Sequence, residues 1–108
     1  MTRVAYEWIV REMDVYDDVI DTMIDETYSG ALSYAMNLGH ERFSISVRKW
    51  YLDKYGEPVD GTTWPEAGVT FYTSSDGSIV SATLPEEFDD GTSIPKRLRA
   101  EVNTQHKD

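Results

Sequence analysis

The chain contains few of the residues that usually carry catalysis or bind metals. It has no cysteine, which excludes disulfides, thiolate metal sites and cysteine nucleophiles. Its two histidines are His40, just after a predicted helix, and His106, in a polar tail. Their spacing is not that of a metal-binding pair, so we expect solvated or helix-capping histidines.

Acidic residues are abundant, and one dense group lies near the N-terminus: Asp14, Asp17, Asp18, Asp21, Asp25 and Glu26. A calcium loop alternates oxygen ligands, carries a central glycine and ends on a bidentate glutamate. The segment that holds these acids has no glycine and runs into a strand-like pattern. We therefore expect no dedicated metal site and no cofactor.

Nucleophilic and acid–base patterns are also missing. Ser75-Asp76-Gly77-Ser78 has the chemistry of a turn rather than of a phosphate-binding loop. No serine sits in a nucleophile elbow, and histidine is too scarce for a triad. The pairs Glu86-Glu87 and Asp89-Asp90 would need burial to act as acid and base, and their loop setting disfavours burial. We predict that the protein is not an enzyme.

Bases and aromatic residues interleave only in Arg48-Lys49-Trp50-Tyr51, as they do in proteins that bind single-stranded nucleic acid. The net charge of −10 disfavours both nucleic acid and anionic membranes as partners. We expect the two aromatic rings to pack in the fold and the two bases to pair with nearby acids.

The charge distribution favours a protein partner with a basic surface, although solubility alone explains the acidity equally well. Residues 1–41 carry nine acids and two bases, and residues 55–94 carry eight acids and no base. Bases prevail only in residues 42–54 and 95–108. A homodimer stays open as a further possibility.

Two long acidic segments, residues 56–68 and 85–93, each contain proline and one large aromatic residue, and both are predicted to be loops. Because loops of this length are often functional, we predict a partner-binding surface centred on Trp64, Glu66, Phe88, Asp89 and Asp90. The alternative is that Trp64 and Phe88 turn inward and anchor their loops.

Apolar residues alternate in the N-terminal part of the chain and predict an antiparallel hairpin. The first strand covers residues 4–13 and the second residues 19–26. A helix capped by Thr27 or Ser29 follows, runs to about Leu38 and is ended by Gly39.

The remaining elements are a long strand, two short strands and a helix. The long strand covers residues 42–52 and ends or bulges near Lys49, where the alternation is lost. Residues 69–73 and 79–84 form short strands around the turn at residues 75–77. Ser93 caps a C-terminal helix that frays after about residue 103, and its apolar face consists of Ile94, Leu98 and Val102.

The predicted fold class is α+β, in a single domain over residues 1–108. We expect an antiparallel sheet of four or five strands, with one helix packed on a face and a C-terminal helix, in the order ββαβββα. The predicted core consists of Tyr6, Trp8, Ile20, Ile24, Leu32, Met36, Phe43, Ile45 and Val47. No apolar run is long enough to span a membrane, and we predict a cytoplasmic protein.

Several short segments, including Tyr6-Glu7-Trp8-Ile9-Val10, Asp18-Val19-Ile20-Asp21 and Leu84-Pro85-Glu86-Glu87-Phe88-Asp89-Asp90-Gly91, have a familiar pattern. Together they resemble small phage and prophage accessory proteins of unknown function, built from a β-hairpin, a helix and further strands. The resemblance skips residues 42–68 and provides no catalytic residues. It implies an accessory protein that acts in a bacterial cytoplasm.

The first functional hypothesis is therefore a non-enzymatic, protein-binding module, such as a phage accessory protein that occupies a host protein. The second is a mimic of nucleic acid that inhibits a DNA-binding host enzyme. Duplex DNA as long as this domain, about 34 Å, carries about twenty phosphate charges, twice the net charge of the chain, which ranks this mimic second. An uncharacterised enzyme comes last.

Overall fold

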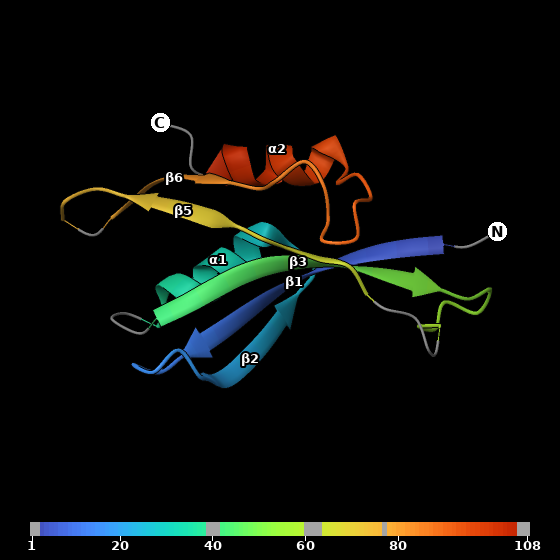
Figure 1. Cartoon of the computed structure of the whole chain (residues 1–108), viewed down its shortest axis with the longest axis horizontal. Helices are drawn as coiled ribbons and strands as arrows, with labels where there is room; N and C mark the ends of the chain where they lie inside the picture. Colours follow the sequence, from blue (N-terminus) through green and yellow to red (C-terminus); the bar gives the residue numbers. More distant parts are fainter. Residues whose placement is uncertain (1–2, 39–41, 60–63, 77, 106–108) are drawn as a thin grey trace.

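The computed structural model describes residues 3–38, 42–59, 64–76 and 78–105 of the chain. These residues form an α+β fold, as the sequence predicts (Figure 1). The elements are β1 (Arg3–Met13), β2 (Val19–Asp25), α1 (Tyr28–Met36), β3 (Arg42–Leu52), β4 (Glu66–Gly68), β5 (Thr70–Thr73), β6 (Ile79–Thr83) and α2 (Lys96–Gln105). The larger sheet is antiparallel with the order β2-β1-β3-β4, and β5 and β6 form a second, two-stranded sheet.

Strands β1 and β3 form the centre of the larger sheet and pair along their whole length. The predicted end or bulge near Lys49 is wrong, because β3 continues to Leu52. The Lys49 ammonium lies 5.1 Å from the ring centre of Tyr51, its neighbour on one face. The Arg48 guanidinium lies 5.7 Å from the ring centre of Trp50 on the other face. These cation–π contacts stabilise the extended chain where apolar alternation ends.

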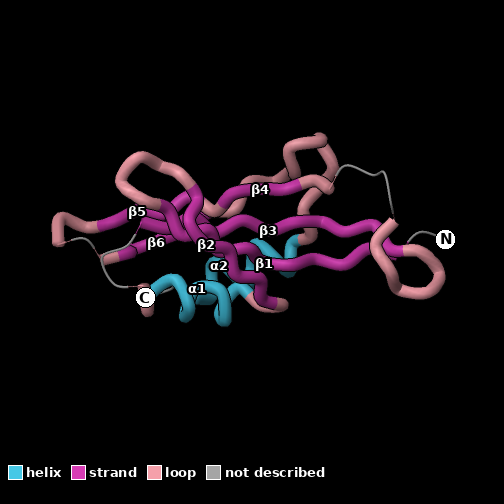
Figure 2. The backbone as a smooth tube through the Cα atoms, turned by 90° about the horizontal axis from the view of Figure 1, so that it is seen from below, coloured by secondary structure: helices cyan, strands magenta, loops and turns pink. Residues whose placement is uncertain are grey.

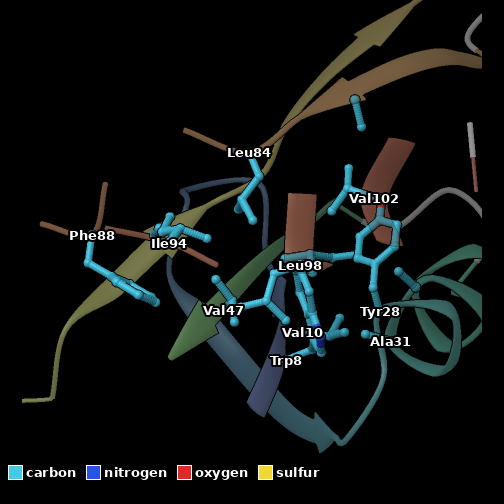
Figure 3. Close-up of a cluster of buried hydrophobic side chains, with 14 residues drawn as sticks. Trp8, Val10, Tyr28, Ala31, Val47, Leu84, Phe88, Ile94, Leu98 and Val102 are labelled. Atoms are coloured by element: carbon cyan, nitrogen blue, oxygen red, sulfur yellow. The ribbon is translucent and has the colours of Figure 1, made fainter. Parts of the chain in front are cut away.

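The main core lies between one face of the larger sheet, which we call the covered face, and the layer formed by α1, α2 and the β5–β6 hairpin (Figure 1). Figure 3 shows its side chains pointing toward one another from the larger sheet, from both helices and from the segment between β6 and α2. The buried residues are Trp8, Val10, Tyr28, Ala31, Ala35, Ile45, Val47, Ala67, Ala82, Leu84, Phe88, Ile94, Leu98 and Val102. Figure 2 views the molecule from below and shows β1, β3 and β4 side by side. We call the second face of this sheet, which no described helix covers, the open face.

Three residues predicted for the core are exposed instead. Ile20 is 56% exposed, Ile24 50% and Met36, at the end of α1, 54%. The register of β2 against β1 places Met23 on the covered face and Ile24 on the open face. A shift in that register near the start of β2 leaves Ile20 without a partner on β1. The choice of face, which depends on register, is therefore opposite to the prediction for this strand.

The C-terminal helix buries the predicted residues but begins later than expected. Leu98 and Val102 are buried on α2, and Ile94 is buried just before it. The helix starts at Lys96, and the Leu98 amide donates to the carbonyl of Pro95 at 3.1 Å. It remains regular to Gln105, beyond the predicted point of fraying.

The N-terminus of α1 is held from two directions. Thr27 caps the helix, as predicted, and its Oγ1 accepts a hydrogen bond from the Gly30 amide at 3.0 Å. Glu101 of α2 accepts a hydrogen bond from the Tyr28 amide at 2.6 Å, which brings a negative charge to the positive end of the helix dipole. The predicted stop at Gly39 lies outside the described residues.

Gly30 is required by a close contact rather than by the helix itself. A Cβ atom at this position would come within 2.5 Å of both carboxylate oxygens of Asp25. That carboxylate is held by the amide of Thr27 at 2.9 Å and by its hydroxyl at 3.1 Å. Alanine here gains helix propensity but displaces a bonded side chain.

We expect Gly30→Ala to lower the free energy of unfolding by about 1 kcal/mol, although helix propensity alone predicts a gain of about 1 kcal/mol. In an Asp25→Ala background the same substitution should stabilise the protein, because the clash is gone. Urea denaturation of the four proteins of this double-mutant cycle measures the effect. A stabilising Gly30→Ala in the natural background would contradict the contact.

The chain passes directly from one sheet to the other after β3. Of the predicted loop 56–68, the last three residues form β4, which the sequence did not predict. The Val69 amide then donates to the carbonyl of Ile45 at 2.8 Å, and β5 turns away to pair with β6. An edge-to-face contact between Phe43 and Phe71, with ring centres 5.7 Å apart, joins the two sheets. The hairpin predicted for residues 69–84 is confirmed.

Candidate functional site

The structure brings together part of the predicted partner surface. The Asp89 amide donates to the Glu66 carbonyl at 3.2 Å, and the Glu66 amide donates to Asp89 Oδ1 at 3.2 Å. The two acidic segments are therefore joined. Asp90 is not part of this junction: its Oδ1 accepts from the amide and hydroxyl of Thr92 at 2.9 and 2.6 Å, and these bonds lower the pKa of Asp90.

The two aromatic residues of that predicted surface lie on opposite faces of the larger sheet. Phe88 is 3% exposed on the covered face and stacks on Tyr6, with ring centres 6.1 Å apart. Trp64 packs against Trp50, whose side chain belongs to the open face, with ring centres 4.3 Å apart. Both rings pack inward, as the alternative reading of the sequence proposed, so they do not form one aromatic centre. A role of these residues in partner binding stays a prediction.

Glu66 is bound by two arginines on the open face. Arg11 makes a two-pronged ion pair with its carboxylate, with an Nη2–Oε2 distance of 3.1 Å, and Arg48 Nη2 lies 3.3 Å from Oε2. Because β3 lies between β1 and β4, the Arg11 side chain crosses β3 to reach Glu66. Ile9 and Ser46 are buried on this same face, which no described helix covers.

The two arginines control the protonation of Glu66. Burial raises the pKa of its carboxyl, but the hydrogen bonds and charges of Arg11 and Arg48 together lower the pKa below its ordinary value. A carboxylate with a lowered pKa in the folded protein stabilises the fold above its unfolded pKa. This contribution is lost as the pH falls through the folded pKa.

We therefore expect Glu66→Gln to lower the free energy of unfolding by about 1–2 kcal/mol at neutral pH, because two partly buried guanidinium groups lose their carboxylate. The difference between the two proteins should shrink as the pH is lowered below the ordinary carboxyl range. Denaturant titrations at neutral and acidic pH test this. A difference that is independent of pH would show that the loss comes from packing.

Exposed apolar side chains gather on the β1–β2 hairpin. Ten large apolar residues are exposed in the described part of the chain, and half of them lie between residues 15 and 24. This set, which we call the β2 surface, consists of Val15, Tyr16, Val19, Ile20 and Ile24, exposed by 77, 82, 52, 56 and 50%. Scattered exposed apolar residues are normal, but a concentration of this kind indicates an interaction surface.

The tip of this hairpin is an ordered turn. Asp14 Oδ1 accepts hydrogen bonds from the amides of Tyr16 at 2.8 Å and Asp18 at 3.0 Å. Asp17 has a φ of 66°, the left-handed conformation that closes such a turn. The exposure of Val15 and Tyr16 is thus fixed by backbone geometry.

Strand β2 is also an edge of the larger sheet, with β1 as its partner on one side and no described strand on the other. Residues 14–26 hold six acids and no base. Among the described residues, one ion pair reaches this segment, from Arg42 to Asp17 at 2.7 Å. In the described part of the chain, this segment therefore combines an unpaired strand edge, exposed apolar side chains and negative charge of which one carboxylate is ion-paired.

The sequence pattern of β2 already indicated an edge strand, although we predicted that Ile20 and Ile24 belong to the core. Asp21 and Asp25 alternate with Ile20 and Ile24, so neither face of the strand is free of charge or of apolar residues. Such a pattern is typical of an edge strand, in which charged residues oppose unwanted pairing.

Known proteins provide no identification. No family model matches the chain, and neither the curated proteins nor the solved structures contain a match. The resemblance to phage and prophage proteins thus stays a prediction. Within the described ranges, no group of three or more acids or histidines is arranged to hold a metal ion, and neither helix is long and apolar enough to cross a membrane.

Proposed function

We propose that this chain is a non-enzymatic, protein-binding module, and that its β2 surface binds an extended, basic segment of the partner by strand addition. In strand addition the main chain of the ligand pairs with a sheet edge, and alternate side chains contact the surface beside it. In this proposal the partner belongs to a bacterial host, which is what the resemblance to phage accessory proteins implies.

The concentration of exposed apolar residues on an edge strand carries the proposal. Ile20 and Ile24 offer the apolar contact area that affinity needs, and the edge of β2 that no described strand pairs with offers backbone donors and acceptors. The acids on β2 oppose pairing of this edge with another acidic strand but leave it able to pair with a basic one. This selectivity supports a role in binding.

The acids of the hairpin select the partner. A second copy of β2 would bring six more acids against the six of residues 14–26, and like charges placed together oppose association. A strand with lysine or arginine is attracted instead, and the attraction weakens as salt increases. The surface therefore favours a basic ligand over a homodimer.

A synthetic peptide of alternating lysine and valine tests this proposal without knowledge of the natural partner. We expect its addition to shift the amide resonances of β2 in a heteronuclear NMR titration, with an affinity that falls several-fold as salt is raised. A peptide of the same sequence with alternate amides N-methylated keeps its charge but loses strand pairing, and should bind much more weakly.

Ile20→Lys with Ile24→Lys should abolish the shifts, whereas Val80→Lys, at an equally exposed position on β6, should leave them unchanged. Equal binding of the methylated peptide would show simple charge attraction and overturn strand addition. Self-association of the unliganded protein through β2, seen by analytical ultracentrifugation, would favour a homodimer and overturn the choice of partner.

A further inference from the structure

A hollow of about 300 Å³ lies on the open face of the larger sheet, where β1 begins and β3 ends. Two residues of β1, two of β3 and two of the segment after β3 line it: Ala5, Glu7, Trp50, Leu52, Gly56 and Pro58. Pro58 forms a β-bridge with Leu52, which folds this segment back over the end of β3. The hollow is thus built by residues from three parts of the chain.

Its position separates it from the β2 surface. The last residue of β2, Asp25, pairs with Trp8, so Ala5 and Glu7 lie beyond the end of that strand. The inference that follows does not depend on the proposed function.

The lining combines a mostly apolar wall with one carboxylate. Ala5, Leu52 and Pro58 provide aliphatic surface, and Trp50 provides an aromatic ring. Glu7 is half-buried and takes part in none of the ion pairs among the described residues. Its volume is at the lower end of the range for small-molecule sites, and its lining has few polar groups, as in such sites.

The base opposite Glu7 in the sheet is engaged elsewhere. Arg48 lies opposite Glu7 in the β1–β3 ladder, but its Nη2 is 3.3 Å from the Glu66 carboxylate, and its guanidinium lies 5.7 Å from the Trp50 ring centre. Glu66 is in turn shared with Arg11. Glu7 therefore keeps its own negative charge available at the edge of the hollow.

We infer that this hollow binds a small organic cation of the alkylammonium class. The Glu7 carboxylate is the counter-ion, and the apolar lining, which includes the Trp50 ring, contacts the alkyl groups. One carboxylate is too few for a metal site, and Glu7 together with the net charge of −10 disfavours an anion. A neutral ligand of the same shape lacks the attraction to Glu7.

Choline and its neutral isostere 3,3-dimethylbutan-1-ol are suitable probes. In a heteronuclear NMR titration we expect choline to shift the amides of Glu7 and Leu52 and the indole resonance of Trp50 in a saturable manner. The neutral alcohol should bind roughly fivefold more weakly or worse, because it lacks the charge. Equal binding of the two compounds would overturn the inference, as would the lack of a saturable shift with choline.

Glu7→Gln should reduce the affinity for choline to that for the alcohol and leave the melting temperature close to that of the natural protein. Glu12→Gln is the matched control, since Glu12 is a half-buried glutamate on the same strand whose position gives it the opposite face. Unchanged choline binding in Glu7→Gln, or an equal loss in Glu12→Gln, would show that Glu7 is not the counter-ion. Shifts confined to β2 would place the site elsewhere and also overturn the inference.

Discussion

Replacement of Ile45 by aspartate is expected to unfold the protein at ordinary temperature. Ile45 is fully buried at the centre of β3, opposite Val10, and its carbonyl accepts the hydrogen bond from Val69 that begins the passage to the second sheet. Loss of a buried isoleucine side chain costs about 2–5 kcal/mol, and an unpaired buried carboxylate costs several more. The total stability of a domain of this size is about 5–15 kcal/mol, so the two losses together exhaust most or all of it.

Circular dichroism and thermal melting of three variants test this expectation. Ile45→Val should remain folded, with a loss of about 0.5–1.5 kcal/mol. Ile24→Asp places the same charge on the exposed face of the edge strand and should melt close to the natural protein. If Ile45→Asp kept the natural melting temperature, the assignment of this residue to the core would be wrong.

The regular elements could be predicted from the sequence because their side chains follow a clear period. In β1 and β3 the apolar residues alternate, and the faces that carry Trp8 and Val47 are indeed buried. The apolar face predicted for the C-terminal helix, Ile94, Leu98 and Val102, is also buried. Local pattern predicts these elements because their main apolar side chains recur with the period of a strand or a helix.

Strand β4 could not be predicted, because its stability does not come from its own sequence. Its three residues include Gly68 and follow Pro65, which gives no apolar period. The strand forms because β3 offers an edge and because Arg11 and Arg48, distant in the chain, bind Glu66. Interactions between side chains so far apart are not visible in a local pattern.

The candidate binding surface was only half predictable for a related reason. The acidity of residues 1–41 suggested a basic partner, which stays a hypothesis, and alternation alone does not tell which face of a strand is buried. In β2 the register places Met23 on the covered face, and Asp25 lies beside the N-terminus of α1, where it contacts Thr27. That arrangement leaves Ile24 on the open face, which reveals an edge surface only once the sheet is known.

Phe88→Ala should cost far more stability than Trp64→Ala, although both residues lie in acidic segments of similar composition. The Phe88 ring is 3% exposed, stacks on Tyr6 with an interplanar angle of 3°, and has the Lys49 ammonium 5.9 Å from its centre. It closes the core between the larger sheet and α2, so its removal leaves a cavity and costs about 3–5 kcal/mol. Trp64 is only half-buried and packs on Trp50, and its loss should cost about 1–2 kcal/mol.

Urea denaturation of the two alanine variants, followed by circular dichroism, measures both losses. Phe88→Leu keeps most of the buried apolar volume and should recover much of the stability that is lost in the alanine variant. The reason is that the stability at this position depends on filling the core and not on the acidic residues around Phe88. Titration of the same variants with a basic partner distinguishes a residue that anchors the core from one that contacts the partner. Replacement of a core anchor lowers the stability but leaves the affinity per folded molecule unchanged. If Phe88→Ala instead kept the natural stability but bound the partner more weakly, Phe88 would belong to the partner surface. Its ring would then contribute contacts to the partner rather than to the core.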